Sequence, residues 1–429
     1  MKLVATRSQV PERRLLERLG RTQRATRFYW RSPAADVELL GLGEVAAIEG
    51  AGPDRLTRAA ESAAALWRGL ELRGAEIPAQ AGPLLVGGFG FWDEATGGTD
   101  WSDFPALRFW VPELLYARIG DRSYTTVTTD LEAVERPSVA RQPWRSCSAR
   151  RAEGFSACAE PSRDEFASAV SRATAAIGAG ELEKVVLARA CTLTQAGGFD
   201  AARVLGALCE SQPGCFVYGV GLGAASFVGA SPERLVRLAG GEVSADALAG
   251  SAPRGRTPEE DARRGQALLD SPKEREEHAI VRRAVVEALA PRSAELRAAE
   301  SPRLLRLEGI QHLHTPVSAT LPESAHATTL SLASALFPTP AVGGAPRAAA
   351  LEFLRRHESA RRGWYSGAIG WLTPGGDGEL CVALRSALLR GDAATLHAGV
   401  GIVAGSTPEA ELDETRWKLA SALGALVEL

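Results

Sequence analysis

Apolar residues along the chain recur at spacings typical of both helices and strands. Helical spacing and end signals predict helices over residues 55–72, 162–178, 259–269, 272–290, 345–360 and 409–427. Alternating or continuous apolar runs predict strands over residues 84–92, 109–118, 183–190, 215–221, 226–229, 234–238, 367–372, 380–388 and 395–403. Because the strands come in hairpin-like runs between helices, the order favours an α+β fold with antiparallel sheets over a doubly wound parallel fold.

A helix start in the middle of the chain suggests how the fold is divided. Ser162 and Glu165 form a capping-box signature ahead of the helix over residues 162–178. The stretch over residues 133–162 is polar, rich in Ser, Arg and Pro, and has no periodicity. We interpret it as the connection between an N-terminal part, residues 1–160, and a second part, residues 161–429.

Composition narrows the class of protein. The length of 429 residues alone suggests two or three domains, and 45% apolar with 24% charged residues is typical of a globular protein. A net charge of -3 without a dominant basic block argues against a nucleic-acid surface. No segment has the length and apolar character of a signal peptide or a membrane span, so we expect a cytoplasmic protein. The six cysteines include no CxxC pair, which favours reduced thiols over a zinc site.

Lysine is rare in this chain, although Lys and Arg together number 49. The lysines are Lys2, Lys184, Lys273 and Lys418. Lys184 lies in an apolar strand, where burial favours the neutral amine, a base able to take a proton from water. The alternative is a lysine that reaches solvent at a sheet edge. We expect Lys273 to be an exposed charge in a helical turn.

Two predicted helices carry carboxylates that could face inward. Glu277 shares a stripe with apolar residues of the helix over 272–290, and Glu411, Glu414 and Lys418 follow one another at helical spacing near the C-terminus. Carboxylates from two helices suit magnesium, which binds few protein ligands together with water and substrate oxygens. The alternative is two ordinary solvated charge stripes.

Glycines and two histidines form the remaining candidates. Gly250-Ser251, Gly343-Gly344 and the glycines over 399–405 could let the backbone approach an anionic ligand, although tight turns explain them equally well. His312 and His314 could form a metal pair, but orientation or packing is the favoured interpretation because no further histidine lies near them in the sequence.

From about Ser162 to the end, these signals resemble the chorismate-utilising enzymes, a family that includes isochorismate, salicylate, anthranilate and aminodeoxychorismate synthases. The matching segments lie at residues 183–189, 227–235, 248–255, 270–278, 312–316, 337–344, 362–370 and 398–418. Residues 1–160 match more loosely, chiefly at 87–91. The resemblance implies one integrated α+β unit with αββα layers, in which two large, mainly antiparallel sheets pack on each other, helices lie outside and a substrate cleft lies between. It replaces the multi-domain expectation from length.

The resemblance also implies roles for individual residues. Lys184 falls at the base that activates water, and Glu233 falls at the general acid. Glu277 and Glu414 fall at the Mg2+ ligands, with Glu274 and Glu411 as outer carboxylates. The positions that contact substrate are Gly250, Ser251, His312, Ala341, Tyr365, Arg385, Gly399 and Lys418.

Within the family, Lys184 favours water over ammonia as the nucleophile, so we expect no glutaminase subunit. Ala341 within residues 338–342 resembles the isochorismate type, since salicylate synthases tend to carry a hydroxyl residue there. Phe337 departs from the His that isochorismate synthases commonly have. The resemblance thus implies a magnesium-dependent isochorismate synthase acting on chorismate. The alternatives are a salicylate synthase, which also eliminates pyruvate, and a non-catalytic chorismate-binding homologue. We expect a monomer, because no coiled-coil seam is evident; the downstream pathway stays open.

Overall fold

The computed structural model describes residues 2–12, 14–22, 24–32, 36–94, 100–132 and 156–427. Most of the connection predicted over 133–162, together with Cys147, therefore lies outside the described residues. The α-helices in the described part are α1 (Leu15–Arg21), α2 (Arg55–Trp67), α3 (Arg163–Gly178), α4 (Ala201–Ser211), α5 (Pro258–Asp270), α6 (Pro272–Leu289), α7 (Thr329–Leu336), α8 (Arg347–His357) and α9 (Pro408–Val427). None of these helices is long and apolar enough to cross a membrane.

Two large sheets dominate the described part of the chain, and all their strand pairs but β1–β5 are antiparallel. The 13-stranded sheet runs in the order β10 (Ser156–Glu160), β11 (Lys184–Thr194), β23 (Ala393–Ile402), β22 (Ser386–Arg390), β13 (Ala225–Ser231), β12 (Phe216–Leu222), β2 (Arg27–Ser32), β3 (Val37–Leu42), β8 (Leu114–Ile119), β9 (Arg122–Asp130), β1 (Leu3–Val10) and β5 (Glu71–Gly74), with β19 (Gly344–Ala345) beside β11. The 10-stranded sheet runs in the order β16 (Glu295–Ala298), β18 (Ile310–Thr320), β15 (Glu242–Pro253), β14 (Arg234–Ala239), β21 (Gly378–Val382), β20 (Ala368–Leu372), β6 (Leu85–Phe89), β7 (Leu107–Val111) and β4 (Ala46–Gly50), with β17 (Arg303–Arg306) beside β18.

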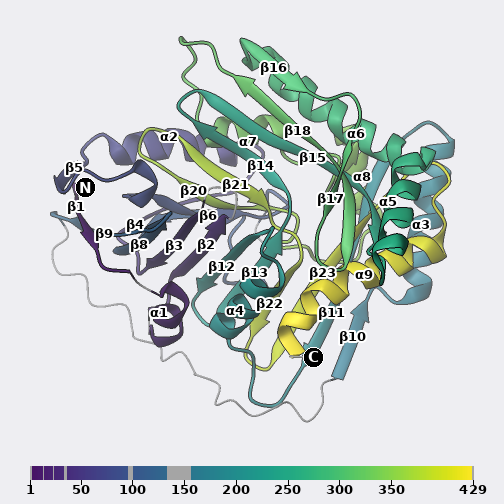
Figure 1. Cartoon of the computed structure of the whole chain (residues 1–429), viewed down its shortest axis with the longest axis horizontal. Coiled ribbons are helices and arrows are strands. Elements are labelled where there is room, and N and C mark those ends of the chain that lie inside the picture. The colour runs from purple at the N-terminus through teal and green to yellow at the C-terminus, as the bar shows by residue number, and fades with distance from the viewer. Residues whose placement is uncertain are drawn as a thin grey trace.

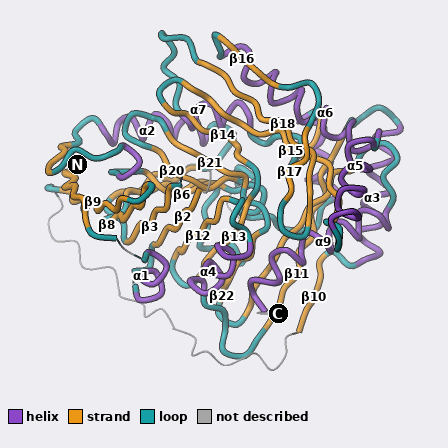
Figure 2. The backbone as a smooth tube through the Cα atoms, viewed as in Figure 1, coloured by secondary structure: helices purple, strands orange, loops and turns teal. Residues whose placement is uncertain are grey.

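The two sheets pack face to face. Large buried side chains of both sheets, such as Trp30 and Tyr218 of one and Trp110 and Trp371 of the other, form a common apolar cluster. Helices α1 and α4 cover the outer face of the 13-stranded sheet, and α2 and α7 cover the 10-stranded sheet. These layers follow one another from bottom to top in Figure 1, and Figure 2 shows the helices around the strands. The αββα prediction of two packed antiparallel sheets is confirmed.

Strands from early and late parts of the chain pair directly in each sheet. Strand β2 pairs with β12, and β6 pairs with β20. Burial of apolar surface between such strands is the main stabilising contribution, at roughly 25 cal/mol per Å² of apolar area. Residues far apart in the sequence therefore share one core.

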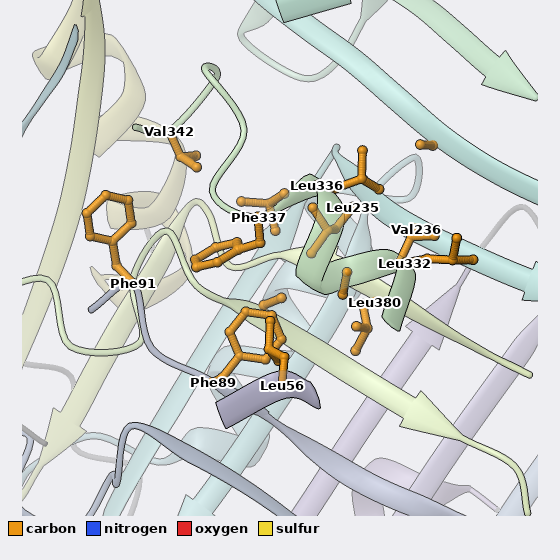
Figure 3. Packing of buried hydrophobic residues seen from close by; sticks show 14 of the residues in the cluster. Leu56, Phe89, Phe91, Leu235, Val236, Leu332, Leu336, Phe337, Val342 and Leu380 are labelled. Carbon is orange, nitrogen blue, oxygen red and sulfur yellow. The ribbon is translucent and has the colours of Figure 1, made fainter. Parts of the chain in front are cut away.

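Phe337 belongs to the core and does not line a ligand pocket. Its ring lies edge-on to Phe89 at 4.9 Å and close to Phe91, as Figure 3 shows. Edge-to-face aromatic pairs add to the stability gained by burial. The departure from the family pattern at this position is thus a change in packing under the sheet.

Two single-strand predictions are wrong in the same way. Residues 109–118 and 380–388 each form parts of two strands, and the two strands belong to different sheets. Pro112, which has no backbone N–H, separates β7 from β8, and Arg385, with a φ of 47°, lies between β21 and β22. The predicted helix over 55–72 ends at Trp67, and strand β5 follows it.

Candidate functional site

Most of the candidate residues line one pocket, with a volume of about 690 Å³ that includes its open mouth. It lies where β15 and β18 of one sheet and β23 of the other meet helices α6 and α9. The candidates in its wall are Glu233, Gly250, Ser251, Glu277, His312, Ala341, Tyr365, Arg385, Gly399 and Lys418. The structure thus brings together residues from nine separate strands, helices and loops, as a ligand site between two sheets requires.

Lys184 lies immediately behind this wall. It is the first residue of β11, its exposure is 0%, and its Nζ lies 2.8 Å from Oε1 of Glu277. Gly401 of the neighbouring strand β23 makes room for it, since a Cβ there would lie 2.8 Å from Cε of Lys184. The alternative of a lysine reaching solvent at a sheet edge is therefore wrong.

Glu233 is a buried carboxyl group in the pocket wall. Its exposure is 2%, and its Oε1 has no hydrogen-bond partner among the described residues. Burial, and then the negative charge of Asp246, raise the pKa of Glu233 to about 8, while the charges of Lys184 and Lys418 oppose the shift. Glu233 is therefore mostly protonated at neutral pH and can donate a proton.

The four candidate metal carboxylates face one another from two helices. Glu274 and Glu277 lie on α6, and Glu411 and Glu414 lie on α9. Burial, and then the charge of Glu277, raise the pKa of Glu274 to about 7. Burial and the charge of Glu414 likewise raise the pKa of Glu411. Lys273 contacts both Glu274 and Glu411, so carboxylates of the two helices lie close together. All four side chains are largely buried, so the alternative of two solvated charge stripes is wrong.

Lysines supply the positive charge in this cluster. Lys273 donates a hydrogen bond of 2.7 Å to Glu411, and Lys418 lies 2.8 Å from Glu414. The expectation that Lys273 is an exposed surface charge is wrong, because the fold brings α6 against α9 and half-buries its side chain. Lysine is rare in this chain, and that rarity was the sequence signal that could have identified Lys273 as a residue of the site.

The donor chemistry of the cluster fits magnesium. In the described part of the chain, no three Asp, Glu, His or Cys side chains are arranged to hold a metal by themselves. Magnesium commonly binds through one or two carboxylates and completes its shell with water and substrate oxygens. Glu277 lines the pocket, and Glu414 contacts the pocket residue Lys418, so these two carboxylates could hold such an ion beside a ligand.

One wall of the pocket is suited to an anion. Nη2 of Arg385 lies 2.7 Å from Nε2 of His312, and Nδ1 of His312 lies 3.1 Å from Oγ of Ser251. Burial, and then the charge of Arg385, hold the pKa of His312 well below its ordinary value, so the neutral ring accepts from Arg385. Nη1 of Arg385 has no hydrogen-bond partner among the described residues, which leaves a buried donor for a ligand carboxylate.

One further residue of the site, His397, gave no recognisable signal in the sequence. His397 lines the pocket and stacks on Tyr365, with ring centroids 5.1 Å apart. A Cβ at Gly399 would lie 2.8 Å from the Tyr365 hydroxyl oxygen, so this contact needs glycine. His314 does not act with His312, because its Nε2 lies 2.8 Å from Oδ1 of Asp246.

Comparisons with known proteins identify the family of the chain. The family model described as chorismate binding enzyme matches residues 1–427. The salicylate biosynthesis isochorismate synthase of Pseudomonas aeruginosa is 37% identical over 94% of this chain and 86% of that protein. The isochorismate synthase MenF of Bacillus subtilis is 32% identical over 93% of this chain and 88% of its own length.

Solved structures give the same result for the fold. The menaquinone-specific isochorismate synthase MenF of Escherichia coli superposes with a TM-score of 0.79 at 26% identity, covering 99% of this chain and 94% of that one. Two packed sheets, a pocket lined by buried ionisable side chains, and a match along nearly the whole sequence all lead to one conclusion. The chain belongs to the family of chorismate-binding enzymes.

Proposed function

We propose that this chain is a magnesium-dependent isochorismate synthase that converts chorismate to isochorismate. The observation that carries the proposal is a pair of buried proton-transfer groups at one pocket: Lys184 behind its wall and Glu233, with its raised pKa, in the wall. A protein that only bound an anion would gain nothing from a protonated acid. The isochorismate synthases that match most of the chain support the same activity.

Two cationic groups would hold the two carboxylates of chorismate. Arg385, whose Nη1 makes no hydrogen bond with any described residue, would bind the enolpyruvyl carboxylate. Lys418, held at Gly399 by a hydrogen bond of 2.8 Å to its carbonyl, would bind the ring carboxylate. Fixing both ends orients the ring between Lys184 and Glu233, which lowers the entropic part of the barrier.

The proton transfers then balance without any further reactant. Neutral Lys184 takes a proton from water as the water oxygen forms a bond to C2 of the ring. The ring double bonds shift, the C4–O bond breaks with its electron pair, and Glu233 gives its proton to the departing hydroxyl, which leaves as water. One water enters and one leaves, so substrate and product are isomers. Lys184 and Glu233 recover their starting forms by proton exchange.

Magnesium would be held by Glu277 and Glu414, with Glu274 and Glu411 around them. When bound, it would supply positive charge for the ring carboxylate and compete with Lys184 for Glu277. Ser251 fixes the neighbouring carboxylate, because its N–H donates 3.1 Å to Glu274.

The alternative products are distinguished at Ala341. This residue lines the pocket with a methyl group and packs near Ala247, Ala249 and Val281. It offers no hydroxyl group where salicylate synthases tend to have one, which favours release of isochorismate before pyruvate is eliminated. The pathway that consumes the product is not part of the proposal.

The test is to incubate the purified protein with chorismate and magnesium and to separate the products by liquid chromatography. We expect isochorismate as the main product, and none when EDTA replaces magnesium. Unchanged chorismate in the presence of magnesium would contradict the proposal and favour a binding protein. Salicylate and pyruvate in equal amounts would favour a salicylate synthase instead.

A further inference from the structure

A second carboxylate lies directly behind the acid Glu233. Asp246 is in β15, and its Oδ2 accepts a hydrogen bond of 3.0 Å from the backbone N–H of Arg234, the residue that follows Glu233. Asp246 does not line the pocket, and its side chain is only 11% exposed. Asp246 therefore contacts the backbone next to Glu233, at a position that does not face the pocket.

His314 of the adjacent strand β18 fixes the other oxygen of Asp246. Its Nε2 lies 2.8 Å from Oδ1, whereas its Nδ1 has no hydrogen-bond partner among the described residues. A carboxylate oxygen can only accept, so Nε2 carries the proton and donates it. Both oxygens of Asp246 thus accept hydrogen bonds, which fix the position of this side chain.

The charged groups around Glu233 differ in sign and come from several elements. Lys184 of β11 and Lys418 of α9 are positive, and Asp246 of β15 is negative. The thiol of Cys381 in β21 also lies near, and burial raises its pKa well above the ordinary value, so it is uncharged. Around the same pocket lie the charged groups Glu277 of α6 and Arg385 and the neutral ring of His312 of β18. Asp246 is the carboxylate that opposes the two lysines.

We propose that Asp246 and His314 form a positioning pair that holds the backbone beside Glu233 and places a negative charge near this acid. The inference rests on the proposed function for its catalytic meaning. Without Asp246, only burial would oppose the charges of Lys184 and Lys418, so the carboxylate form of Glu233 would become more favourable and the leaving hydroxyl group would more often lack its proton donor.

The test is the pH dependence of kcat/KM in the variant Asp246→Asn. Asparagine keeps an oxygen for the N–H of Arg234, and its amide can face His314 in the other tautomer, so the variant removes mainly the charge. We expect the fall of kcat/KM at alkaline pH to begin about one pH unit lower than in the wild type. Asp246→Thr, a second neutral variant suited to a strand, is expected to behave alike if the first folds poorly.

Two controls separate this effect from a structural one. Glu242→Gln removes an exposed carboxylate of the same strand β15, and Asp246→Glu keeps the charge; the alkaline limb should stay in place in both. If the neutral variants lose activity equally at every pH with the limb unmoved, Asp246 only stabilises the sheet and the inference is overturned.

A titration without substrate distinguishes a failure of this inference from a failure of the proposed function. The infrared band of the protonated Glu233 carboxyl group, identified by its loss in Glu233→Gln, is followed against pH in the wild type and in Asp246→Asn. We expect the band to disappear at lower pH in the variant, even in a protein that makes no isochorismate. Identical titrations would refute the role of Asp246, whereas a shifted band without turnover would refute only the proposed function.

Discussion

The arrangement around Lys184 shows how a side chain that normally seeks water can be kept inside a protein. The lysine is fully buried, and Glu277 supplies the only charge that it contacts within the described residues. Desolvation of such a pair costs several kcal/mol per ion, which good geometry only partly repays. A chain that otherwise uses arginine for surface charge keeps this amine at some cost in stability, which is expected for a group retained for catalysis.

Replacement of Lys184 by methionine should abolish most turnover, measured at a temperature at which circular dichroism shows the variant to be folded, because the buried Glu277 loses its counterion. Methionine fills a similar volume but cannot accept a proton, so we expect kcat to fall by about 10² to 10⁴-fold. The control is Lys2→Met, which removes an exposed lysine that pairs with Glu71. Steady-state kinetics with chorismate measures both. A Lys184→Met enzyme with wild-type kcat would exclude this amine as the base.

The raised pKa of Glu233 sets the alkaline limit of activity. Below a pH of about 8 the acid is mostly protonated and can donate, whereas above it the carboxylate predominates. We therefore expect kcat/KM to fall about tenfold per pH unit above that point. The Glu233→Gln enzyme should be slow and should lack this limb. A limb that persists in the glutamine variant would show that another group titrates.

At the residue scale, a residue of the site could be predicted where it left a mark in the sequence, such as a rare residue type or an unusual position. Lys184 and Lys418 stand out in a lysine-poor chain, and Glu277 stands out on an apolar helical stripe. Asp246 and His397 carry no such mark, because their importance comes from strands that pair only in the folded sheet. Only the folded structure brings them to the site.

At the scale of elements, one buried arginine joins the segments around the site. Arg362 has an exposure of 0% and donates 2.6 Å to the carbonyl of Val186 in β11 and 2.7 Å to the carbonyl of Val342. It also pairs with Glu358 at 2.6 Å, and Glu358 accepts the N–H of Ala188. Since Val186 and Val342 line the pocket, this network holds its back wall together.

Replacement of Arg362 by methionine should therefore destabilise the protein strongly. Removal of one partner leaves the buried carboxylate of Glu358 without its counterion, and such losses cost about 3–5 kcal/mol. Urea unfolding followed by tryptophan fluorescence would measure the change. The double variant with Glu358→Gln should recover part of the loss, because no lone charge remains. Equal stability of the single variant and the wild type would contradict this account of the network.

Helix and strand positions were predicted well where periodicity was clear, and the errors occurred where a strand changes sheet. The capping box at Ser162 is present in the structure, α6 begins at the predicted residue 272, and α9 begins one residue before the predicted residue 409. Apolar patterning cannot show that β7 and β8, or β21 and β22, belong to different sheets, since no exposed residue interrupts either joint region. Arg385 lies at the second of these corners, so the same bend supplies the anion-binding side chain.

At the scale of the whole molecule, the fold places the first turn of α6 against the first turn of α9, although more than a hundred residues separate the two helices. Their four carboxylates repel one another, as the raised pKa values of Glu274 and Glu411 show. A divalent cation would relieve this repulsion and would stabilise the native state in proportion to its affinity.

We expect magnesium to raise the melting temperature of the wild-type protein and to raise that of Glu414→Gln much less. Binding at a hundredfold excess over Kd corresponds to about 2.7 kcal/mol of added stability. The matched control is Glu409→Gln, an exposed carboxylate one turn away on α9, which should respond like the wild type. Calorimetric scans with and without magnesium give the comparison. An equal response in Glu414→Gln would place the cation elsewhere.

The central claim is that water, activated by the amine of Lys184, becomes the new hydroxyl group while the old one departs on a proton from Glu233. Turnover of chorismate in water enriched in oxygen-18, stopped early and analysed by mass spectrometry, tests it most directly. The account predicts isochorismate with one solvent oxygen at C2 and no retained C4 hydroxyl oxygen. Isochorismate free of solvent oxygen would contradict it, because the hydroxyl group would then have migrated within the substrate.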